Sequence, residues 1–552
     1  MAERTDVYFV DGVRTPFGRA GEKGMYWNTR ADDLVVKAMI GLLERNPDVP
    51  KDRVDDVAIA ATTQVGDQGL TLGRTAALLA GLPRSVPGFA IDRMCAGAMT
   101  SVTTLGSGIA LPTEDLREEN LGFLAKVDEQ ITANDELATM LEAGGFDAVF
   151  LADVVGAYDV FRGGLETALH EGLQIPSNDP MLVIPAMAAV TTHLGFGVTF
   201  STSYEPPFAF ARRMSTLDHL TKGRVGWNIV TSYLPNAARN FGLAGEIPHD
   251  ERYAIADEYL HVLYKLWEGS WDDDAVLRDA EHNVYTDSTK VRYINHVGEY
   301  FSVAGPHLSE PSRQRTPVLY QATASTAGID FAGRHAEVVF TGGPSYDKVL
   351  AGIQAMRDAV AANGREASAI KFIVQAGIVV GRTEEEAAEK LRAFRELASV
   401  EGRLAHQSVP FDPMAHEPHT TVREALIAEG RQDAPGATFL PLDKTVAEYL
   451  AGITESWDEL FFVCGTPTTV ADAIESWLDD VGIDGINLRQ YHSFGTAQDF
   501  IELVVPELRA RGRLREAYVD GETLRERLFG GSPRLTHPHP AVRYRGGANL
   551  QG

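Results

Sequence analysis

Cysteine is the rarest residue of this 552-residue chain, which contains only Cys95 and Cys464. Two isolated cysteines supply neither a disulfide framework nor a pair spaced for zinc, so we expect no structural metal. Because no cysteine pattern indicates an oxidising compartment, we expect a cytoplasmic protein.

Long apolar runs are also absent, and basic residues are few relative to acidic ones. No stretch approaches the length of a membrane-spanning helix, and the first thirty residues contain no apolar signal-peptide core. The 50 Lys and Arg residues are outnumbered by 77 Asp and Glu residues, which gives a formal net charge of −27. Such a charge repels phosphate backbones and anionic lipids, so we expect neither nucleic acid nor a membrane surface as a partner.

Short apolar runs alternate with longer amphipathic stretches from residue 131 to the C-terminus. In residues 253–267, for example, Tyr253, Leu260 and Trp267 recur at helical spacing. This alternation predicts a parallel sheet that is covered by helices on both faces. The seven predicted strands are residues 146–153, 196–204, 225–232, 316–323, 336–343, 370–377 and 485–492.

The predicted strands end in polar residues, which are Asp153, Thr202, Ser232, Gln321, Gln375 and Gln490. In a (β/α)8 barrel the chemistry lies at the carboxyl ends of the strands. The length of this region suits such a barrel with insertions, so the expected fold class is an α/β TIM barrel. Seven strands are one fewer than a closed barrel needs.

The first 110 residues follow a different pattern. Residues 6–10 and 54–62 predict strands, and residues 31–45 predict a helix. Cys95 lies just before a predicted helix of small residues, whose dipole favours the thiolate. A polar, acidic linker follows. The expected organisation is a segment at 1–110, a linker at 111–130 and the barrel at 131–552.

Two N-terminal motifs, VDGVRTPFGRAGEKG and IDRMCAGAMTSV, closely resemble the start of thiolases, the acetyl-CoA acyltransferases. The resemblance covers about residues 5–110 and would make Cys95 the acyl-accepting nucleophile. The thiolase pattern also requires a Gly-His-Pro histidine and a second cysteine in a Gly-rich turn, and neither occurs, since Cys464 lies in FFVCGTP. Without a base that activates the thiol, acyl transfer cannot proceed. We therefore expect a truncated, catalytically inactive thiolase-like segment.

Many strings of the C-terminal region resemble, in order, the bacterial luciferase-like, FMN-dependent monooxygenases of the nitrilotriacetate and dibenzothiophene-sulfone group. Within that group the region is most similar to long-chain alkane monooxygenases. The strings include FLADVVGAYDVFR, QIPSNDP, GRVGWNIVTS, HDERYAIADEYLHVLYKLWEGSW and GPHLSEPSRQRTPVLYQA. The resemblance implies a two-component enzyme that receives reduced FMN from an NAD(P)H:flavin reductase. O2 is then the co-substrate, and one of its oxygen atoms passes through a flavin C4a-hydroperoxide into a small apolar substrate such as a long-chain alkane.

The resemblance also assigns site residues. The flavin would be held by Asp153, Asn228, Ser232, Tyr233, Arg252, Tyr253, Ala322, Thr323, Ala324 and Ser325. The pocket in which oxygen reacts would be lined by Tyr158, Gln174 and His406, the last in a loop after a helix at 384–399. Independently of the resemblance, backbone N–H groups and hydroxyls in QATASTAG suit either a phosphate or an ordinary helix cap. We also expect a homodimer or higher homo-oligomer.

Departures from the family pattern affect the same site. The pattern has a histidine where this chain has Tyr233 and a glycine where it has Thr323. It also has a first strand, with a cysteine and a histidine near the flavin, which is replaced here by the thiolase-like segment and the linker. Residues 123–127 or a thiolase-like strand could fill the gap, an oligomer partner could cover it, or the chain could fold poorly. The alternative functions are therefore a CoA-dependent acyltransferase that uses Cys95 and a catalytically impaired fusion.

Overall fold

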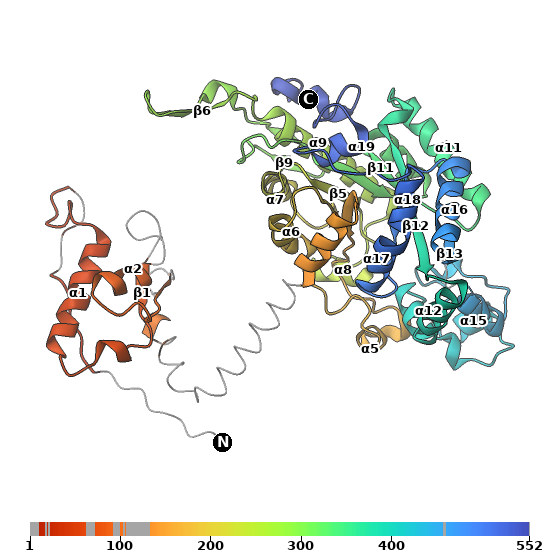
Figure 1. Ribbon diagram of the computed structural model, residues 1–552, viewed down its shortest axis with the longest axis horizontal. Helices are drawn as coiled ribbons and strands as arrows, with labels where there is room; N and C mark the ends of the chain where they lie inside the picture. The colour runs from red at the N-terminus through yellow and green to blue at the C-terminus, as the bar shows by residue number, and fades with distance from the viewer. Residues whose placement is uncertain are drawn as a thin grey trace, which may run out of the picture. The chain divides into compact units, whose positions relative to one another are not determined.

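The computed structural model describes residues 10–16, 19, 22–61, 72–91, 100–102, 105, 133–455 and 460–550. Contacts divide the chain into two units, Met1–Gln130 and Ile131–Gly552. Cys95, the predicted strand at 6–10 and residues 123–127 lie outside the described residues, apart from Val10. Each unit is considered by itself (Figure 1).

The first unit is a small α/β arrangement. Helix α1 (Ala31–Arg45) has the predicted bounds, with two acidic residues in its first turn that favour the helix dipole. Strands β1 (Ala58–Ala60) and β2 (Phe89–Ile91) pair in parallel, and β1 is shorter than the predicted strand at 54–62. Helix α2 (Leu72–Leu79) packs against both α1 and β2. Few of the described residues of this unit are buried, and the apolar cluster that they form is small.

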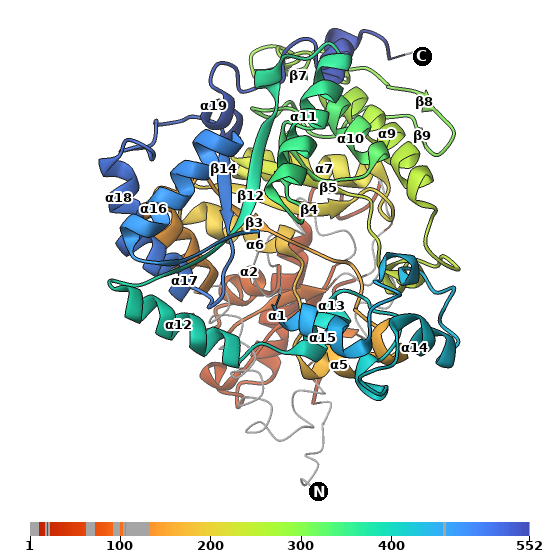
Figure 2. The same cartoon turned by 90° about the vertical axis from the view of Figure 1, so that its right-hand side faces the viewer.

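The second unit is built on one parallel sheet of eight described strands, around which the helices are arranged (Figures 1 and 2). The strand order is β13-β12-β11-β10-β5-β4-β3, and β14 also pairs with β12. The strands are β3 (Ala148–Leu151), β4 (Gly195–Ser201), β5 (Val225–Val230), β10 (Val318–Ala322), β11 (Val338–Thr341), β12 (Lys371–Val380), β13 (Phe461–Gly465) and β14 (Gly485–Leu488).

The helices of the second unit follow the strands in βα order, starting with a helix at residues 133–143. The others are α5 (Glu166–His170), α6 (Pro180–Ala189), α7 (Pro207–Leu220), α8 (Pro235–Asn240), α9 (His249–Tyr264), α10 (Thr326–His335), α11 (Tyr346–Ala362), α12 (Glu384–Glu396), α13 (Val400–His406), α14 (Val422–Ala428), α15 (Val446–Glu455), α16 (Pro467–Ser476), α17 (Gly495–Asp499), α18 (Val505–Ala510) and α19 (Leu524–Phe529). Two antiparallel hairpins, β6 (Val276–Asp279) with β7 (Val284–Thr286) and β8 (His296–Val297) with β9 (Ser302–Val303), lie between α9 and β10.

All seven predicted strands form, but the prediction was incomplete in two ways. It missed β13, which pairs with the second half of β12 at Ala376–Val380. It also placed a strand end at Gln375, which was wrong because β12 continues to Val380. The first half of β12 pairs with β14 instead, so one long strand serves two neighbours.

An open seam separates β3 from β14. Among the described residues, β3 pairs only with β4, and β14 pairs only with β12. Every residue of both edge strands is partly exposed, whereas β4 and β5 are buried almost throughout. A groove of about 250 Å3 runs along the seam, with Val149, Phe340 and Ile486 among its apolar walls. The observed sheet is therefore a barrel that the described residues leave open at one position.

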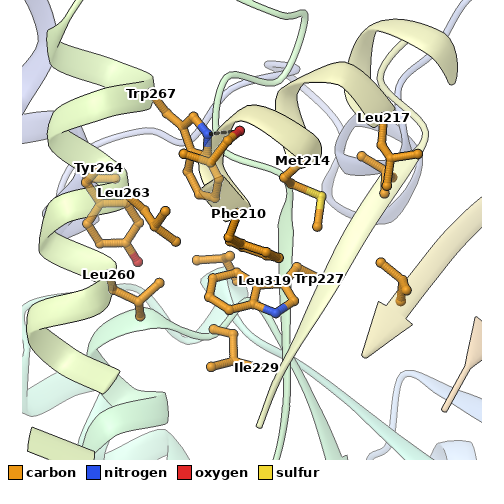
Figure 3. Packing of buried hydrophobic residues seen from close by; sticks show 14 of the residues in the cluster. Phe210, Met214, Leu217, Trp227, Ile229, Leu260, Leu263, Tyr264, Trp267 and Leu319 are labelled. Carbon is orange, nitrogen blue, oxygen red and sulfur yellow. Dashed lines mark hydrogen bonds between the residues drawn. The ribbon is translucent and has the colours of Figure 1, made fainter. Parts of the chain in front are cut away.

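The main core lies between β5, α7 and α9 (Figure 3). The rings of Phe210 and Trp227 are 4.6 Å apart, and both side chains are fully buried. The Trp267 indole donates a hydrogen bond of 3.2 Å to the carbonyl of Ala211, which ties the turn after α9 to α7. This rigid layer supports the residues at the carboxyl ends of β5 and β10.

Helices α13, α14 and α15 form a separate apolar cluster at the end of the sheet that α5 also approaches (Figure 2). The length of the sequence predicted a barrel with insertions, but not the place of this one. No helix in the described part of the chain is both long and apolar enough to cross a membrane. The same residues contain no group of His, Cys, Asp and Glu that could hold a metal ion.

Candidate functional site

A cavity of about 310 Å3 lies at the carboxyl ends of β3, β5 and β10, where the barrel predicts chemistry. Its floor is supplied by the last residues of β5 and β10, and its sides by the loops that follow them and by the start of α9. The lining residues are Asp153, Val154, Val155, Ile229, Val230, Thr231, Ser232, Tyr233, Leu234, Ala237, His249, Arg252, Tyr253, Gln321 and Ala322.

Gln321 supplies a buried polar atom without a partner in the wall of this cavity. It is 2% exposed, and its Oε1 accepts no hydrogen bond from the described residues. Asn228 is 5% exposed, and although its amide donates to Thr199 Oγ1 at 3.0 Å, its Oδ1 also accepts none. An unsatisfied buried acceptor costs about 1–3 kcal/mol, so Gln321 Oε1 in the cavity wall indicates a place for a ligand with a donor.

The loop after β5 adopts an unusual backbone conformation. Ser232 has φ +55°, and its hydroxyl donates to Ser201 Oγ at 2.8 Å. The Arg252 guanidinium donates to the Ser232 carbonyl, while Arg252 Nε is buried without a partner. A residue other than glycine in the left-handed region is strained, and such strain is characteristic of functional loops.

Asp153 follows β3 by two residues and faces the cavity. Burial raises the pKa of its carboxyl group, and the negative charge of Asp179 raises it further. Asp179 caps α6 by accepting a hydrogen bond from the Met181 amide at 2.9 Å. The cavity therefore contains a carboxyl group that takes up a proton more readily than an exposed aspartate.

The turn between β10 and α10 borders a second, open cavity. Ser325 caps α10, since its hydroxyl accepts from the Gly328 amide at 3.2 Å. Tyr253 and Thr323 are joined through their hydroxyls at 3.2 Å. Any side chain at Gly328 would collide with Thr323 Oγ1, so this close approach requires glycine. The open cavity is lined by His249, Asp250, Ser325, Thr326, Ala327 and Asp330.

The residues predicted for the oxygen pocket lie together behind Tyr233. The hydroxyls of Tyr158 and Tyr233 are 3.0 Å apart, and Tyr158 donates toward Gln174 Oε1 at 3.4 Å. The His406 ring lies 5.1 Å from the Tyr158 ring and belongs to the end of α13, so the predicted loop position was wrong. Partial burial lowers the pKa of His406, and the charges of Arg489 and Arg403 lower it further. The ring is therefore neutral at neutral pH.

The structure brings the predicted cofactor residues to two adjoining places. Asp153, Ser232, Tyr233, Arg252, Tyr253 and Ala322 line the first cavity, and Ser325 lines the second. Asn228 does not line either cavity and lies within β5, where its amide donates to Thr199. Thr323 contacts Tyr253, and Ala324 lies between Thr323 and the cap of α10. Sequence reasoning left Gln321 and His249 out of the site, although the polar end of an otherwise apolar strand had marked Gln321.

The sequence family that describes luciferase-like monooxygenases matches residues 108–485. The chain belongs to the luciferase-like monooxygenase family. Enzymes of this family use reduced flavin. The chain is 50% identical over 413 residues to the long-chain alkane monooxygenase of Geobacillus thermodenitrificans, covering 74% of this chain and 90% of that enzyme. It is 43% identical over 420 residues to the dimethyl-sulfide monooxygenase of Hyphomicrobium sulfonivorans, covering 74% and 86%.

Solved structures of the family agree with the fold. The crystal structure of a long-chain alkane monooxygenase is similar with a TM-score of 0.69 at 49% identity, covering 75% of this chain and 92% of that one. A riboflavin lyase solved with a modified FMN and riboflavin gives a TM-score of 0.66 at 36% identity, covering 75% and 92%. The parallel sheet of this luciferase-like chain is therefore that of a TIM barrel.

The N-terminal unit is similar to a different family of proteins. The family that describes the thiolase N-terminal domain matches residues 7–116. The chain is 42% identical over 105 residues to the beta-ketoadipyl-CoA thiolase of Pseudomonas putida, which covers 19% of this chain and 26% of that enzyme. This luciferase-like monooxygenase thus begins with a segment that is similar to about a quarter of a thiolase.

Proposed function

We propose that the protein is the oxygenase component of a two-component, FMN-dependent monooxygenase that hydroxylates a long-chain alkane or a similarly apolar substrate. The observation that carries this proposal is the cavity at the carboxyl ends of β3, β5 and β10, in whose wall the buried Gln321 Oε1 has no partner among the described residues. The substrate class rests on the 50% identity to an alkane monooxygenase.

The residues around the cavity fit a flavin mononucleotide. A flavin ring carries N–H donors and carbonyl acceptors on an apolar, planar body, and the cavity combines unpartnered polar atoms with walls such as Ile229 and Leu234. The phosphate would lie toward the N-terminus of α10, where Ser325 and Thr326 offer a hydroxyl and backbone amides. Arg252 supplies a positive charge in the wall of the first cavity.

Reduced flavin activates O2 for transfer of one oxygen atom to the substrate and of the other to water. The chain supplies an environment for that chemistry. Burial raises the pKa of Tyr158, so its hydroxyl stays protonated and can act as a hydrogen-bond donor. The neighbouring His406 is neutral, and Val154, Val155 and Leu234 give the cavity an apolar lining.

The test is conversion of hexadecane to a primary alcohol in the presence of FMN, NAD(P)H and a separate flavin reductase. The proposal predicts alcohol formation that requires all of these components and falls strongly in Asn228→Ala. Asn363→Ala is the matched control, because Asn363 is exposed at the C-terminus of α11 and its side-chain amide donates to the Ala359 carbonyl of the same helix. No product at saturating reduced FMN would defeat the alkane assignment, whereas failure to bind FMN would defeat the flavin assignment.

The thiolase-like segment is proposed to be catalytically inactive. The segment covers only 26% of the thiolase to which it is similar. The sequence also contains no Gly-His-Pro histidine and no second cysteine in a Gly-rich turn. We expect no cleavage of acetoacetyl-CoA and no acyl-CoA labelling of Cys95 in the purified protein. Cleavage that disappears in Cys95→Ala would establish the acyltransferase alternative instead.

A further inference from the structure

The loops that border the first cavity follow two strands that are not neighbours. Residues 152–160 come directly after β3 and residues 231–234 come directly after β5, and both loops supply walls of the cavity. Strand β4 lies between β3 and β5 in the sheet, and among the described residues β3 pairs with no other strand. The backbone pairing of the sheet therefore does not hold these two loops together.

Asn236, the second residue of α8, joins the loop after β3 to the segment that follows β5. Its Oδ1 accepts a hydrogen bond from the Ala157 backbone N–H at 3.0 Å, and its Nδ2 donates to Asp159 Oδ2 at 2.9 Å. A backbone N–H can only donate and a carboxylate oxygen can only accept, so one orientation of the amide satisfies both partners. Arg239, in the same helix, also forms an ion pair with Asp159.

The backbones of the two segments also lie in contact. A Cβ atom at Gly156 would lie 2.5 Å from the Ala237 backbone nitrogen, so any side chain at this position would push the loop away from α8. Ala237 is fully buried and has no room to move aside. Gly156 therefore allows a close approach directly before the residues that Asn236 holds.

Tyr158 lies between the two residues that Asn236 contacts. Its hydroxyl oxygen is 3.0 Å from that of Tyr233, which lines the cavity, and its ring is 5.1 Å from the His406 ring. A displacement of the loop after β3 would change both distances, whichever hydroxyl donates to the other. A displacement of about 1 Å near a reacting centre can lower a rate by about two orders of magnitude.

We propose that Asn236 is a positioning residue, which clamps the loop after β3 to α8 and so fixes Tyr158 beside the cavity. This inference rests on the proposed flavin function. Asn236 lines neither cavity, so its effect on the reaction passes through the loop that it holds. The clamp matters because β3 is an edge strand at the open seam, where no described strand supports the loop from the other side.

The position of Tyr158 can be followed without flavin. Fluorotyrosine placed at position 158 should give one narrow 19F NMR resonance, shifted from that of the free amino acid. Asn236→Ala should broaden or split this resonance, while the midpoint of thermal unfolding changes by less than about 4 °C. Asn240→Ala is the matched control, since Asn240 is an exposed amide of the same helix that donates to Asn236 Oδ1, and it should leave the resonance unchanged. An unchanged resonance in Asn236→Ala would overturn the proposal.

An exchange of the two side chains tests the clamp even if Asn236→Ala fails to fold. Asn236→Asp places two carboxylates in contact and should displace the loop. Adding Asp159→Asn restores one N–H donor and one acceptor between the two positions, and the carboxylate at position 236 can still accept from the Ala157 N–H. The double variant should recover the narrow resonance and most of the kcat. A double variant that resembles Asn236→Asp in both measurements would contradict the proposal.

Coupling to Tyr158 separates a positioning role from a purely structural one. Asn236→Ala should lower kcat about tenfold, with the KM for the substrate changed less than about threefold. In the Tyr158→Phe background it should lower kcat no further, because the hydroxyl that it positions is absent. Effects that multiply would show that Asn236 acts independently of Tyr158. If the unmodified protein binds no FMN or forms no product, the proposed function fails, but the 19F spectra still decide whether the clamp exists.

Discussion

Replacing Gln321 by methionine should make the flavin-free protein more stable. The side chain is 2% exposed and its Oε1 has no partner, so the folded state bears the desolvation cost of an unsatisfied acceptor. That cost is about 1–3 kcal/mol. Methionine has nearly the same length and flexibility and adapts well to irregular space. We therefore expect Gln321→Met to raise the free energy of unfolding by about 1 kcal/mol.

The same substitution should weaken flavin binding. If Oε1 accepts a hydrogen bond from the flavin, its loss removes about 1 kcal/mol of binding energy, which corresponds to roughly a fivefold to tenfold increase in Kd. Urea unfolding of the flavin-free protein measures the first quantity, and quenching of FMN fluorescence measures the second. A stability gain together with an affinity loss would identify Gln321 as a residue kept for binding rather than for folding.

Gln314 provides the matched control. It is also fully buried, and its Oε1 also has no partner among the described residues, but it lies outside the cavity and its amide donates to Asp218 Oδ1 at 2.7 Å and to the Val225 carbonyl at 2.8 Å. Gln314→Met removes these satisfied hydrogen bonds from a buried carboxylate, so it should destabilise the protein by about 2–4 kcal/mol. A destabilising Gln321→Met, or an unchanged FMN affinity in that variant, would refute the reasoning about the cavity floor.

Three further outcomes follow from other parts of the second unit. Burial lowers the pKa of His307 to about 4, below 6.5 in the unfolded chain, so the folded state loses stability as the pH falls from about 6.5 to 4. The loss is up to about 3 kcal/mol and should be missing from the urea-unfolding curves of His307→Gln. The buried Arg525 guanidinium lies 2.7 Å from the Glu337 carboxylate. Glu337→Gln removes this counter-charge, so the free energy of unfolding, obtained from thermal unfolding, should fall by about 3–5 kcal/mol. Amide hydrogens of β3 and β14 should exchange faster than those of β4 and β5, because both edge strands are partly exposed along the seam. Equal protection of all four strands would show that the seam is covered.

The periodicity of the sequence predicted most of the sheet. Buried parallel strands are apolar runs with clear ends, and all seven predicted runs form strands. The errors lie where one strand serves two neighbours. The strand predicted at residues 370–377 was given a polar end at Gln375. The observed strand β12 continues to Val380, because β13 pairs with its second half. Such pairing depends on strands about eighty residues apart along the chain and leaves no local signal.

The candidate site was predicted less completely. The polar residues at strand ends follow from the barrel geometry, and the resemblance to flavin enzymes supplied the residues of the loops. The contact between Tyr158 and Tyr233 was not predicted, because it depends on how two loops pack and not on spacing in either one. The unpartnered state of Gln321 Oε1 likewise becomes visible only when every possible neighbour has been placed.

Oxygen labelling tests the account most directly. The protein is supplied with reduced FMN by a flavin reductase, incubated with hexadecane under 18O2, and the products are measured by mass spectrometry. The account predicts one 18O atom in a primary alcohol, at a yield that falls in Asn228→Ala and is unchanged in Asn363→Ala. FMN binding without any labelled product would contradict it, because the cavity at the strand ends would then hold a flavin that does not oxygenate this class of substrate.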